Sequence, residues 1–556
     1  MLYPKSNLYR TVTSLNGLWH FSVVADDYLP HAPLQEYRLT AVPASMNEIV
    51  TDTETKNHVG KIVYECVFSV PHISKSEYRL RLGAVSHKCE VYLNGVKIGA
   101  GINGYLPIDL PLECLLEKNR LSVVIDNRLT NETFPPGRLE GRKQIINHDF
   151  YNYTGIHRDV LVYSRPKQHI EDIEIQTVVD GDYRKIKINA KTTCEKISYQ
   201  ILDKSGEPVI TSENSEIMIP NPALWSPESP YLYTLIAQTE CDQYEERFGI
   251  RKVEVDGNRF LLNDKPVYFK GFGMHEDFFI LGKGNSSAVN IRNFELLKWI
   301  HANSIRTSHY PYSEEIMNLA DEYGIMVIEE VPAVGMNWWE ENFGANGANE
   351  NTLKLHKELI TQLYERDKNH PSVIMLSVAN EAATNEALGE TYFKEVIAHA
   401  RELWPLPITI VEFYKSDETL VSKYVDVICI NRYFGWYYDH GDLSVICEQM
   451  KEELCRWHDR YQKPIILTEY GADTVEGLHS LPAESFSEEF QKEYFEQCGE
   501  AFDAFDFCIG EHPWAFADFK TKQGLTRVRG NRKGIFTKDR QPKSGAFYLR
   551  DRWKKR

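Results

Sequence analysis

Apolar and polar residues alternate in short runs through the first part of the chain. Runs such as "KIVYECVFSV", "KCEVYLNGVKIG" and "RLSVVIDNRL" place every second side chain on one face, which predicts β-strands. Asn94-Gly95 separates two such runs and predicts a hairpin, because both residues tolerate the positive φ of a type I′ turn. The pattern predicts a β-sandwich over residues 1–165. A second strand-rich segment, interrupted by "IPNPALWSPESP", predicts a smaller immunoglobulin-like sandwich over residues 166–252.

The pattern changes after residue 252, where apolar runs alternate with amphipathic helical segments. In "SEEIMNLADEYG", Ile316 and Ala320 share one face, and Gly324 stands where a helix would end. Eight apolar runs over residues 253–556 predict a (β/α)₈ TIM barrel. A doubly wound sheet would normally have a Gly-rich phosphate turn after its first strand, and "KGFGMHED" is not one. The eight runs are "VYFKGFG", "SIRTSHYP", "IMVIEEVP", "VIMLSVANE", "ITIVEF", "VDVICINRY", "PIILTEYG" and "DFCIGEHPWAF".

Glu381 and Glu469 each stand at the end of a predicted barrel strand, the fourth and the seventh. The carboxyl ends of barrel strands carry the catalytic groups of such folds, so we expect both side chains at one cavity. Two facing carboxyls are what glycoside hydrolysis requires, one as an acid and one as a nucleophile or base. Either glutamate alone would equally fit a solvated loop residue or the partner of a nearby arginine.

Composition and charge narrow the function classes. The chain has 63 Lys and Arg against 80 Asp and Glu, a net charge of −17, which argues against a nucleic-acid or anionic membrane surface. It has no apolar run long enough to span a bilayer and no signal-peptide pattern at its start, so we expect a cytoplasmic protein. The ten cysteines form no CxxC pair, and no metal cluster or phosphate loop is visible. We expect no metal, no cofactor and a homo-oligomer.

Several motifs carry a family resemblance. "SVANE", "NRYFGWY", "TEYGADT", "RTSHYPY" and "NYTGIHRDV" resemble glycoside hydrolase family 2. The segment "WAFADFKTKQGLTRVRGNRKGIFTKDRQPKSGAF" resembles the β-glucuronidases within that family, of the bacterial gut type. The resemblance covers essentially the whole chain in the same order. It implies a jelly-roll sugar-binding domain, an immunoglobulin-like domain and a catalytic barrel. The implied activity is exo-acting hydrolysis of β-D-glucuronides with retention of configuration, on small-molecule or oligosaccharide substrates.

The resemblance also implies roles for residues near the two glutamates. Glu381 is similar to the acid/base and Glu469 to the nucleophile, with a raised pKa expected for Glu381 and an ionised Glu469. Tyr433 resembles the tyrosine that hydrogen-bonds the nucleophile, and Asn380 the amide that holds the sugar 2-hydroxyl. Without the motifs, Asn380 and Tyr433 would fit satisfied polar groups of the core equally well.

Substrate specificity is implied by residues near the C-terminus. Asn531 and Lys533 in "GNRKG" match the Asn-x-Lys pattern by which β-glucuronidases hold the sugar carboxylate, where an ammonium and an amide form charge-assisted bonds. Elsewhere such a triplet would be an exposed turn. Arg527 lies upstream of this pair, and Trp514 resembles a platform for the sugar ring. Further residues that resemble sugar contacts are Asp149, from the first domain, His309 and Tyr437.

Two departures from the family pattern widen the range of possible substrates. Arg529 stands where some relatives have glycine and adds a cation beside the carboxylate site, so a β-galacturonidase is an alternative. The segment "GMNWWEENFGANGANEN" is shorter than the overhanging loop of some relatives, which predicts an aglycone side open to large substrates. The sequence also leaves open a β-galactosidase-like or β-mannosidase-like exo-glycosidase of family 2 and a non-catalytic carbohydrate-binding protein.

Overall fold

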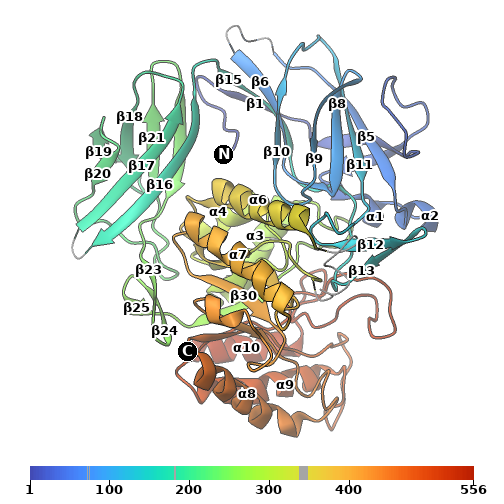
Figure 1. Ribbon diagram of the computed structural model, residues 1–556, viewed down its shortest axis with the longest axis vertical. Helices are drawn as coiled ribbons and strands as arrows, with labels where there is room; N and C mark the ends of the chain where they lie inside the picture. The colour runs from blue at the N-terminus through green and yellow to red at the C-terminus, as the bar shows by residue number, and fades with distance from the viewer. Residues whose placement is uncertain (72, 74–75, 181–182, 337–347) are drawn as a thin grey trace.

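The computed structural model describes residues 1–71, 73, 76–180, 183–336 and 348–556. Figure 1 shows two β-rich parts side by side, the first in blue and the second in green, above a barrel coloured yellow to red. The three-part fold predicted from the sequence is confirmed.

The first part is a sandwich of two antiparallel sheets. In β2 (Gly17–Val23) the alternation of "GLWHFSV" buries Trp19 and Phe21 between the sheets, where they join a core of aliphatic side chains. Asn94 and Gly95 form the hairpin between β8 (Lys88–Leu93) and β9 (Val96–Gly101) with φ values of 52° and 85°, which confirms the predicted turn. The four-stranded sheet has the order β1 (Thr11–Ser14), β15 (Val160–Pro166), β6 (Ser76–Leu82), β10 (Ile108–Leu112). The six-stranded sheet has the order β3 (Arg38–Val42), β2 (Gly17–Val23), β5 (Lys61–Phe68), β11 (Asn119–Asp126), β8 (Lys88–Leu93), β9 (Val96–Gly101).

Smaller elements of the first part lie on the side facing the barrel. They are β4 (Ala44–Ser45), β14 (Gly155–Ile156) and β7 (Val85–Ser86), the hairpin β12 (Gly137–Glu140)–β13 (Lys143–Ile146), and the short helices α1 (Met46–Ile49) and α2 (Thr53–Lys56).

The second part is a smaller sandwich around a core rich in isoleucine and tyrosine. One sheet has the order β16 (Ile170–Asp180), β17 (Tyr183–Thr192), β20 (Glu216–Met218), and the other β19 (Pro208–Ser212), β18 (Ser198–Leu202), β21 (Tyr233–Gln238), β22 (Gln243–Phe248). We propose domain borders at 165/166 and 252/253, because β15 ends and β16 begins around the first, and β23 (Val253–Asp256) begins at the second.

The third part is a closed barrel of eight parallel strands. All eight residues of β29 are buried, as expected for a parallel strand covered on both faces. The strands are β26 (Phe269–Gly273), β27 (Ser304–Arg306), β28 (Met326–Glu330), β29 (Val373–Asn380), β30 (Ile408–Glu412), β31 (Ile428–Asn431), β32 (Ile465–Glu469) and β33 (Cys508–Glu511). The surrounding helices are α3 (Ser287–Trp299), α4 (Glu314–Tyr323), α6 (Glu350–Asp367), α7 (Ala387–Leu403), α8 (Ile446–Tyr461), α9 (Glu488–Asp503) and α10 (Ser544–Lys555), with the short 3₁₀ helix η2 (Leu443–Val445) before α8.

The helix prediction holds with one exception. Helix α4 is capped by Ser313, buries Ile316 and Ala320, and ends at Gly324 in the left-handed conformation. Between β30 and β31, however, residues 413–427 are described throughout and contain only the short 3₁₀ helix η1 (Ser422–Tyr424). No helix in the described part of the chain is both long and apolar enough to cross a membrane.

The N-terminal end of the barrel is plugged by a feature that the sequence pattern did not predict. The antiparallel strands β23, β24 (Arg259–Leu262) and β25 (Lys265–Pro266) pack Phe260 and Leu262 against barrel-strand side chains at this end. Trp225, from the Pro-rich segment of the second part, completes this plug and donates from its indole nitrogen to the Asp321 carbonyl at 2.9 Å. The carboxyl ends of the strands therefore form the open end of the barrel.

Candidate active site

Glu381 follows directly after β29, at the open end of the barrel. Its backbone has φ 50° and donates to the Val411 carbonyl of the neighbouring strand at 2.8 Å, which turns the side chain away from the strand direction. One carboxylate oxygen accepts from Asn431 Nδ2 at 2.8 Å. The Asn431 oxygen in turn accepts from the Thr468 hydroxyl at 2.9 Å, which fixes the amide with its nitrogen toward Glu381. Glu381 is thus held by an uncharged donor.

Glu469, the last residue of β32, is held by charged and hydrogen-bonding groups on both oxygens. One oxygen accepts from Arg306, and His309 Nε2 lies 3.7 Å from the same atom. The other accepts from the Tyr433 hydroxyl at 2.7 Å. Burial holds the pKa of Tyr433 well above its usual range, so the phenol stays protonated and donates to the carboxylate.

Arg306 at the end of β27 is itself held by Glu330 at the end of β28. Both Glu330 oxygens accept from the arginine at 2.9 Å, and His309 Nδ1 and the Ser377 hydroxyl each lie 2.7 Å from this carboxylate. Burial alone would raise the pKa of Glu330, but Arg306 and His309 outweigh it and lower that pKa. Arg306 and Glu330 are both fully buried, so this ion pair holds the arginine in place. The arginine in turn fixes the position of Glu469.

The pKa values of the two candidate catalytic carboxyls are both raised by burial. The sequence predicted a raised pKa for Glu381 alone, with Glu469 ionised. Arg306 opposes the rise at Glu469, while the negative charge of Glu381 adds to it. The two pKa values therefore shift in the same direction, and the carboxyls differ in their hydrogen-bond partners, an arginine and a phenol for Glu469 and an amide for Glu381.

Lys533 and Asn531 lie together in the segment between β33 and α10. Lys533 is fully buried, and its ammonium donates to the Tyr437 hydroxyl at 2.8 Å and to Asp473. Asn531 pairs with Phe519 through backbone hydrogen bonds, and its side-chain oxygen accepts from the Lys533 backbone at 3.0 Å. The preceding Gly530 has φ 121°, and a Cβ there would lie 2.2 Å from the Phe519 carbonyl, so this close approach requires glycine.

Arg527 and Asp149 join the first part of the protein to this segment. Arg527 Nη2 lies 2.7 Å from Asp149 Oδ2, and the same nitrogen donates to the Tyr437 hydroxyl at 2.8 Å. Asn531 Nδ2 also donates to Asp149, at 3.1 Å. The Asp149 side chain is 43% exposed, so this pair lies at the rim of the site. Two cations, two carboxylates, an amide and a phenol thus form one polar cluster.

Aromatic rings connect this cluster with the glutamates. The Tyr433 and Tyr437 ring centroids are 5.0 Å apart, and the Lys533 ammonium lies 5.6 Å from the Tyr433 ring. On the other side, Trp514 stacks on His309 with centroids 5.1 Å apart. All the residues that the sequence singled out are therefore brought together at the open end of the barrel. They are Asp149, His309, Asn380, Glu381, Tyr433, Tyr437, Glu469, Trp514, Arg527, Asn531 and Lys533.

Sequence reasoning missed four residues of this site: Arg306, Glu330, Asn431 and Asp473. Three end barrel strands, and Asp473 lies in the quoted motif "TEYGADT". Arg306, Glu330 and Asn431 therefore had the same signal that selected Glu469, a position at the end of a strand. Arg529 is exposed with φ 60° and forms no ion pair with any residue that the structure describes. The segment expected to leave the aglycone side open lies largely outside the described residues.

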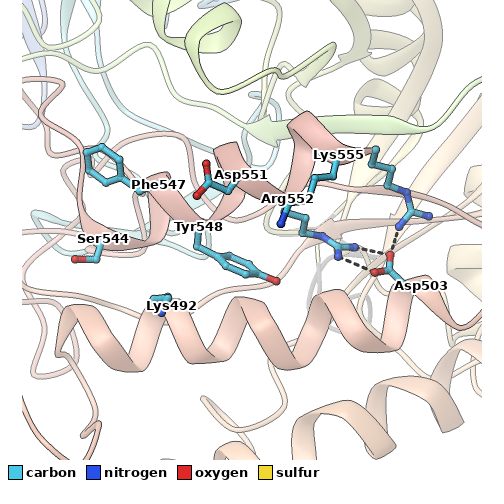
Figure 2. Close-up of a pocket in the computed structure, with 9 residues that line it drawn as sticks. Lys492, Asp503, Ser544, Phe547, Tyr548, Asp551, Arg552 and Lys555 are labelled. Atoms are coloured by element: carbon cyan, nitrogen blue, oxygen red, sulfur yellow. Dashed lines mark hydrogen bonds and ion pairs between the residues drawn. The ribbon is translucent and has the colours of Figure 1, made fainter.

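A cavity of about 940 Å³ lies elsewhere, between helices α9 and α10. Figure 2 shows Arg552 paired with Asp503 beside this cavity. The two hydrogen bonds of this pair are 2.7 and 2.8 Å long. No predicted site residue lines this cavity. Within the described ranges, no group of three or more His, Cys, Asp or Glu side chains has the arrangement of a metal site.

Comparisons with known proteins agree along the whole chain. Three family models match: "Glycosyl hydrolases family 2, sugar binding domain" over residues 12–166, "Glycosyl hydrolases family 2" over 168–251, and "Glycosyl hydrolases family 2, TIM barrel domain" over 253–556. A β-glucuronidase of Paenibacillus borealis is 43% identical, covering 100% of this chain and 98% of that protein.

Solved structures are similar over the same length. A β-glucuronidase from an uncultured Clostridium sp. is 45% identical with a TM-score of 0.97, covering 100% of both chains. A Ruminococcus gnavus β-glucuronidase in complex with D-glucaro 1,5-lactone is 37% identical with a TM-score of 0.93, covering 99% of both. The chain belongs to glycoside hydrolase family 2.

Proposed function

We propose that this protein is a retaining, exo-acting β-glucuronidase that releases glucuronic acid from β-D-glucuronides. The observation that carries this proposal is the buried ammonium of Lys533 beside Asn531 and Arg527, joined through the Tyr433 and Tyr437 rings to Glu469. A sugar with Glu469 at its anomeric carbon would present its C6 carboxylate to this cluster. A neutral CH₂OH would offer these donors no carboxylate for charge-assisted hydrogen bonds.

In the proposed reaction, Glu469 attacks the anomeric carbon while Glu381 protonates the leaving oxygen. Retention requires carboxyls about 5 to 5.5 Å apart. Burial raises the pKa of both carboxyls, but Arg306 and Tyr433 oppose that rise at Glu469, whereas the hydrogen-bond partner of Glu381 is the neutral amide of Asn431. Once Glu469 is esterified it carries no charge, so Glu381 ionises more readily and can activate the water that releases the sugar.

The remaining residues are proposed to hold the sugar. Asn380, whose side-chain oxygen accepts from Arg306 at 3.3 Å, would face the 2-hydroxyl. Asp149 would accept from another hydroxyl, His309 would also bond a hydroxyl, and the Trp514 face would support the ring. Neighbouring residues hold these side chains in place before the substrate enters, which suits the task of orienting a sugar for attack.

The printed names of the relatives support the same substrate class. The proteins from Paenibacillus borealis and from Streptococcus agalactiae, the latter 38% identical over 100% of this chain and 98% of its own length, are both called β-glucuronidases. The compound in the Ruminococcus gnavus complex, D-glucaro 1,5-lactone, is a derivative of a sugar acid.

One assay tests the proposal. Purified protein is incubated with the 4-nitrophenyl β-glucuronide, β-galacturonide, β-galactoside and β-mannoside, and nitrophenol release is measured. We expect the glucuronide to be cleaved fastest, with NMR showing β-glucuronic acid as the first product. Faster cleavage of the galacturonide or a neutral glycoside would overturn the substrate assignment, and no cleavage of any would overturn the enzymatic one.

We also propose a cytoplasmic location, homo-oligomerisation and an aglycone side open to large glucuronides. All ten cysteines are free, which suits a reducing compartment. Ultracentrifugation tests the oligomeric state, and kcat/KM values for small and oligosaccharide glucuronides test the open aglycone side.

A further inference from the structure

Asp473 is a buried carboxylate that sits behind the proposed carboxylate-binding groups. It lies four residues after Glu469, on the loop that follows β32. One oxygen accepts from the Arg532 backbone nitrogen at 2.8 Å, and the other pairs with the Lys533 ammonium and lies 3.7 Å from Arg527. The loop that directly follows the proposed nucleophile therefore also holds the segment of residues 527–533.

The surroundings of Lys533 explain why this carboxylate matters. The ammonium is fully buried and lies 4.6, 5.4 and 5.6 Å from the ring centroids of Tyr437, Trp436 and Tyr433. Asp473 is the carboxylate with which Lys533 forms an ion pair among the described residues. A buried ammonium without a counter-ion is energetically costly and loses its fixed direction.

We propose that Asp473 is a positioning residue for substrate recognition, which fixes the Lys533 ammonium in the direction of the substrate carboxylate. This inference rests on the proposed β-glucuronidase function. Asp473 does not touch the reacting atoms, so its effect passes through Lys533. The negative charge of Asp473 repels an anionic sugar. Because the bond to Lys533 is already made before the substrate enters, we expect the positioning effect of Asp473 to outweigh this repulsion.

A double-mutant cycle between Asp473 and Lys533 tests this inference. We expect Asp473→Asn to lower kcat/KM for 4-nitrophenyl β-glucuronide about ten- to a hundredfold while changing cleavage of the β-glucoside, followed at high enzyme concentration, less than about threefold. In the Lys533→Ala background the same substitution should cause no further loss, because Asp473 then has nothing to aim. A purely structural role would give losses that multiply and that affect both substrates equally.

Two further variants control for folding. Asp473→Glu keeps the charge beside Lys533 and should recover at least about threefold of the glucuronide activity lost in Asp473→Asn. Asp518→Asn removes a buried carboxylate of the same region that pairs with Lys543 and Arg532 instead, and should leave the ratio of glucuronide to glucoside cleavage unchanged. Glucoside cleavage in each variant reports an intact barrel.

Three results would overturn the inference: multiplying losses in the cycle, equal loss on both substrates, or faster glucuronide cleavage by Asp473→Asn, which would mean that repulsion outweighs positioning. These are distinct from failure of the proposed function. A wild-type protein that cleaves no glucuronide refutes the function, whereas one that cleaves it with an uncoupled cycle refutes the role of Asp473 alone.

Discussion

The two halves of the candidate site are built in different ways. Around Glu469, the groups come from the ends of barrel strands and from residues just after them, and Arg306 and Glu330 are fully buried. Around Lys533, the groups come from loops of the barrel and from the first part of the protein, and the Arg527–Asp149 pair reaches the surface. Strand ends hold side chains rigidly, whereas loops vary without disturbing the barrel.

This difference separates chemistry from specificity. A substitution at a strand end should reduce cleavage of every substrate, because all glycosides need the same two carboxyls. A substitution in the loop cluster should change the choice among substrates, because only a uronic acid presents a carboxylate there. The following predictions test this division, from the largest expected effect to the smallest.

Glu469→Gln should lower kcat/KM for every glycoside by at least about a thousandfold, because the amide cannot attack the anomeric carbon. Glu412→Gln is the matched control. Glu412 also ends a buried barrel strand, but its carboxylate accepts from the hydroxyls of Thr384, Thr419 and Ser422 and contacts no predicted site residue. Initial rates of both variants test whether Glu469 is the nucleophile. Near-wild-type turnover by Glu469→Gln would rule out that role for Glu469.

Glu381→Gln should reduce cleavage of alkyl glucuronides far more than of nitrophenyl glucuronides, since a good leaving group needs little protonation. Because burial raises the pKa of Glu381, the acid form persists to higher pH than in an exposed glutamate. In the wild type, kcat/KM should therefore fall as pH rises through that pKa, and the variant should lack this decline. Equal losses on both leaving groups, or an unchanged pH profile, would count against an acid role.

Lys533→Ala should lower kcat/KM for glucuronides roughly ten- to several-hundredfold, as expected when about 1.5 to 3 kcal/mol of charged hydrogen bonding is lost. Cleavage of a β-glucoside should hardly change, so the selectivity ratio collapses. Arg527 can compensate in part, and an Arg527→Ala, Lys533→Ala double variant then gives the full loss. If Lys533→Ala slows both substrates by the same factor, the loop cluster is structural and the glucuronidase assignment fails.

Arg529→Gly should have the smallest effect on catalysis, less than about threefold, because water screens an exposed cation. The variant should instead be more stable by about 0.5 to 1 kcal/mol, since glycine tolerates the positive φ at this position. Gln462→Gly, at the left-handed end of α8 and outside the site, should give a similar gain. Urea unfolding and the glucuronide to galacturonide ratio measure both effects, and a large shift in that ratio would make Arg529 a specificity residue.

The sequence predicted the fold well because each part has its own periodicity. Alternation marked the two sandwiches, and fully apolar runs marked the eight parallel strands. The strands β23–β25 were missed because they are only two to four residues long and lie next to apolar barrel runs. The connection without an α-helix after β30 was missed because a barrel pattern leads one to expect a helix at every crossing.

The site was predicted where a motif named it and missed where a residue only supports another. Glu330, Glu412, Glu469 and Glu511 all end barrel strands. Position at a strand end cannot distinguish them, since Glu511 turns outward to Arg552 and Glu412 to hydroxyls, while Glu330 binds Arg306. The difference lies in contacts between residues far apart in the sequence, which no local pattern contains.

The plug at the lower end of the barrel has a consequence for modularity. The boundary at residue 252/253 suggests that the catalytic barrel could be exchanged between relatives as one unit. The apolar plug at the N-terminal end of the barrel, however, includes Trp225, which precedes that boundary. Trp225 also packs against Gly249, whose added Cβ would lie 2.8 Å from the Trp225 side chain. A barrel recombined at residue 253 would lack this indole and expose apolar surface to water. Recombination that moves the barrel between relatives should therefore carry the segment from before Trp225 with it.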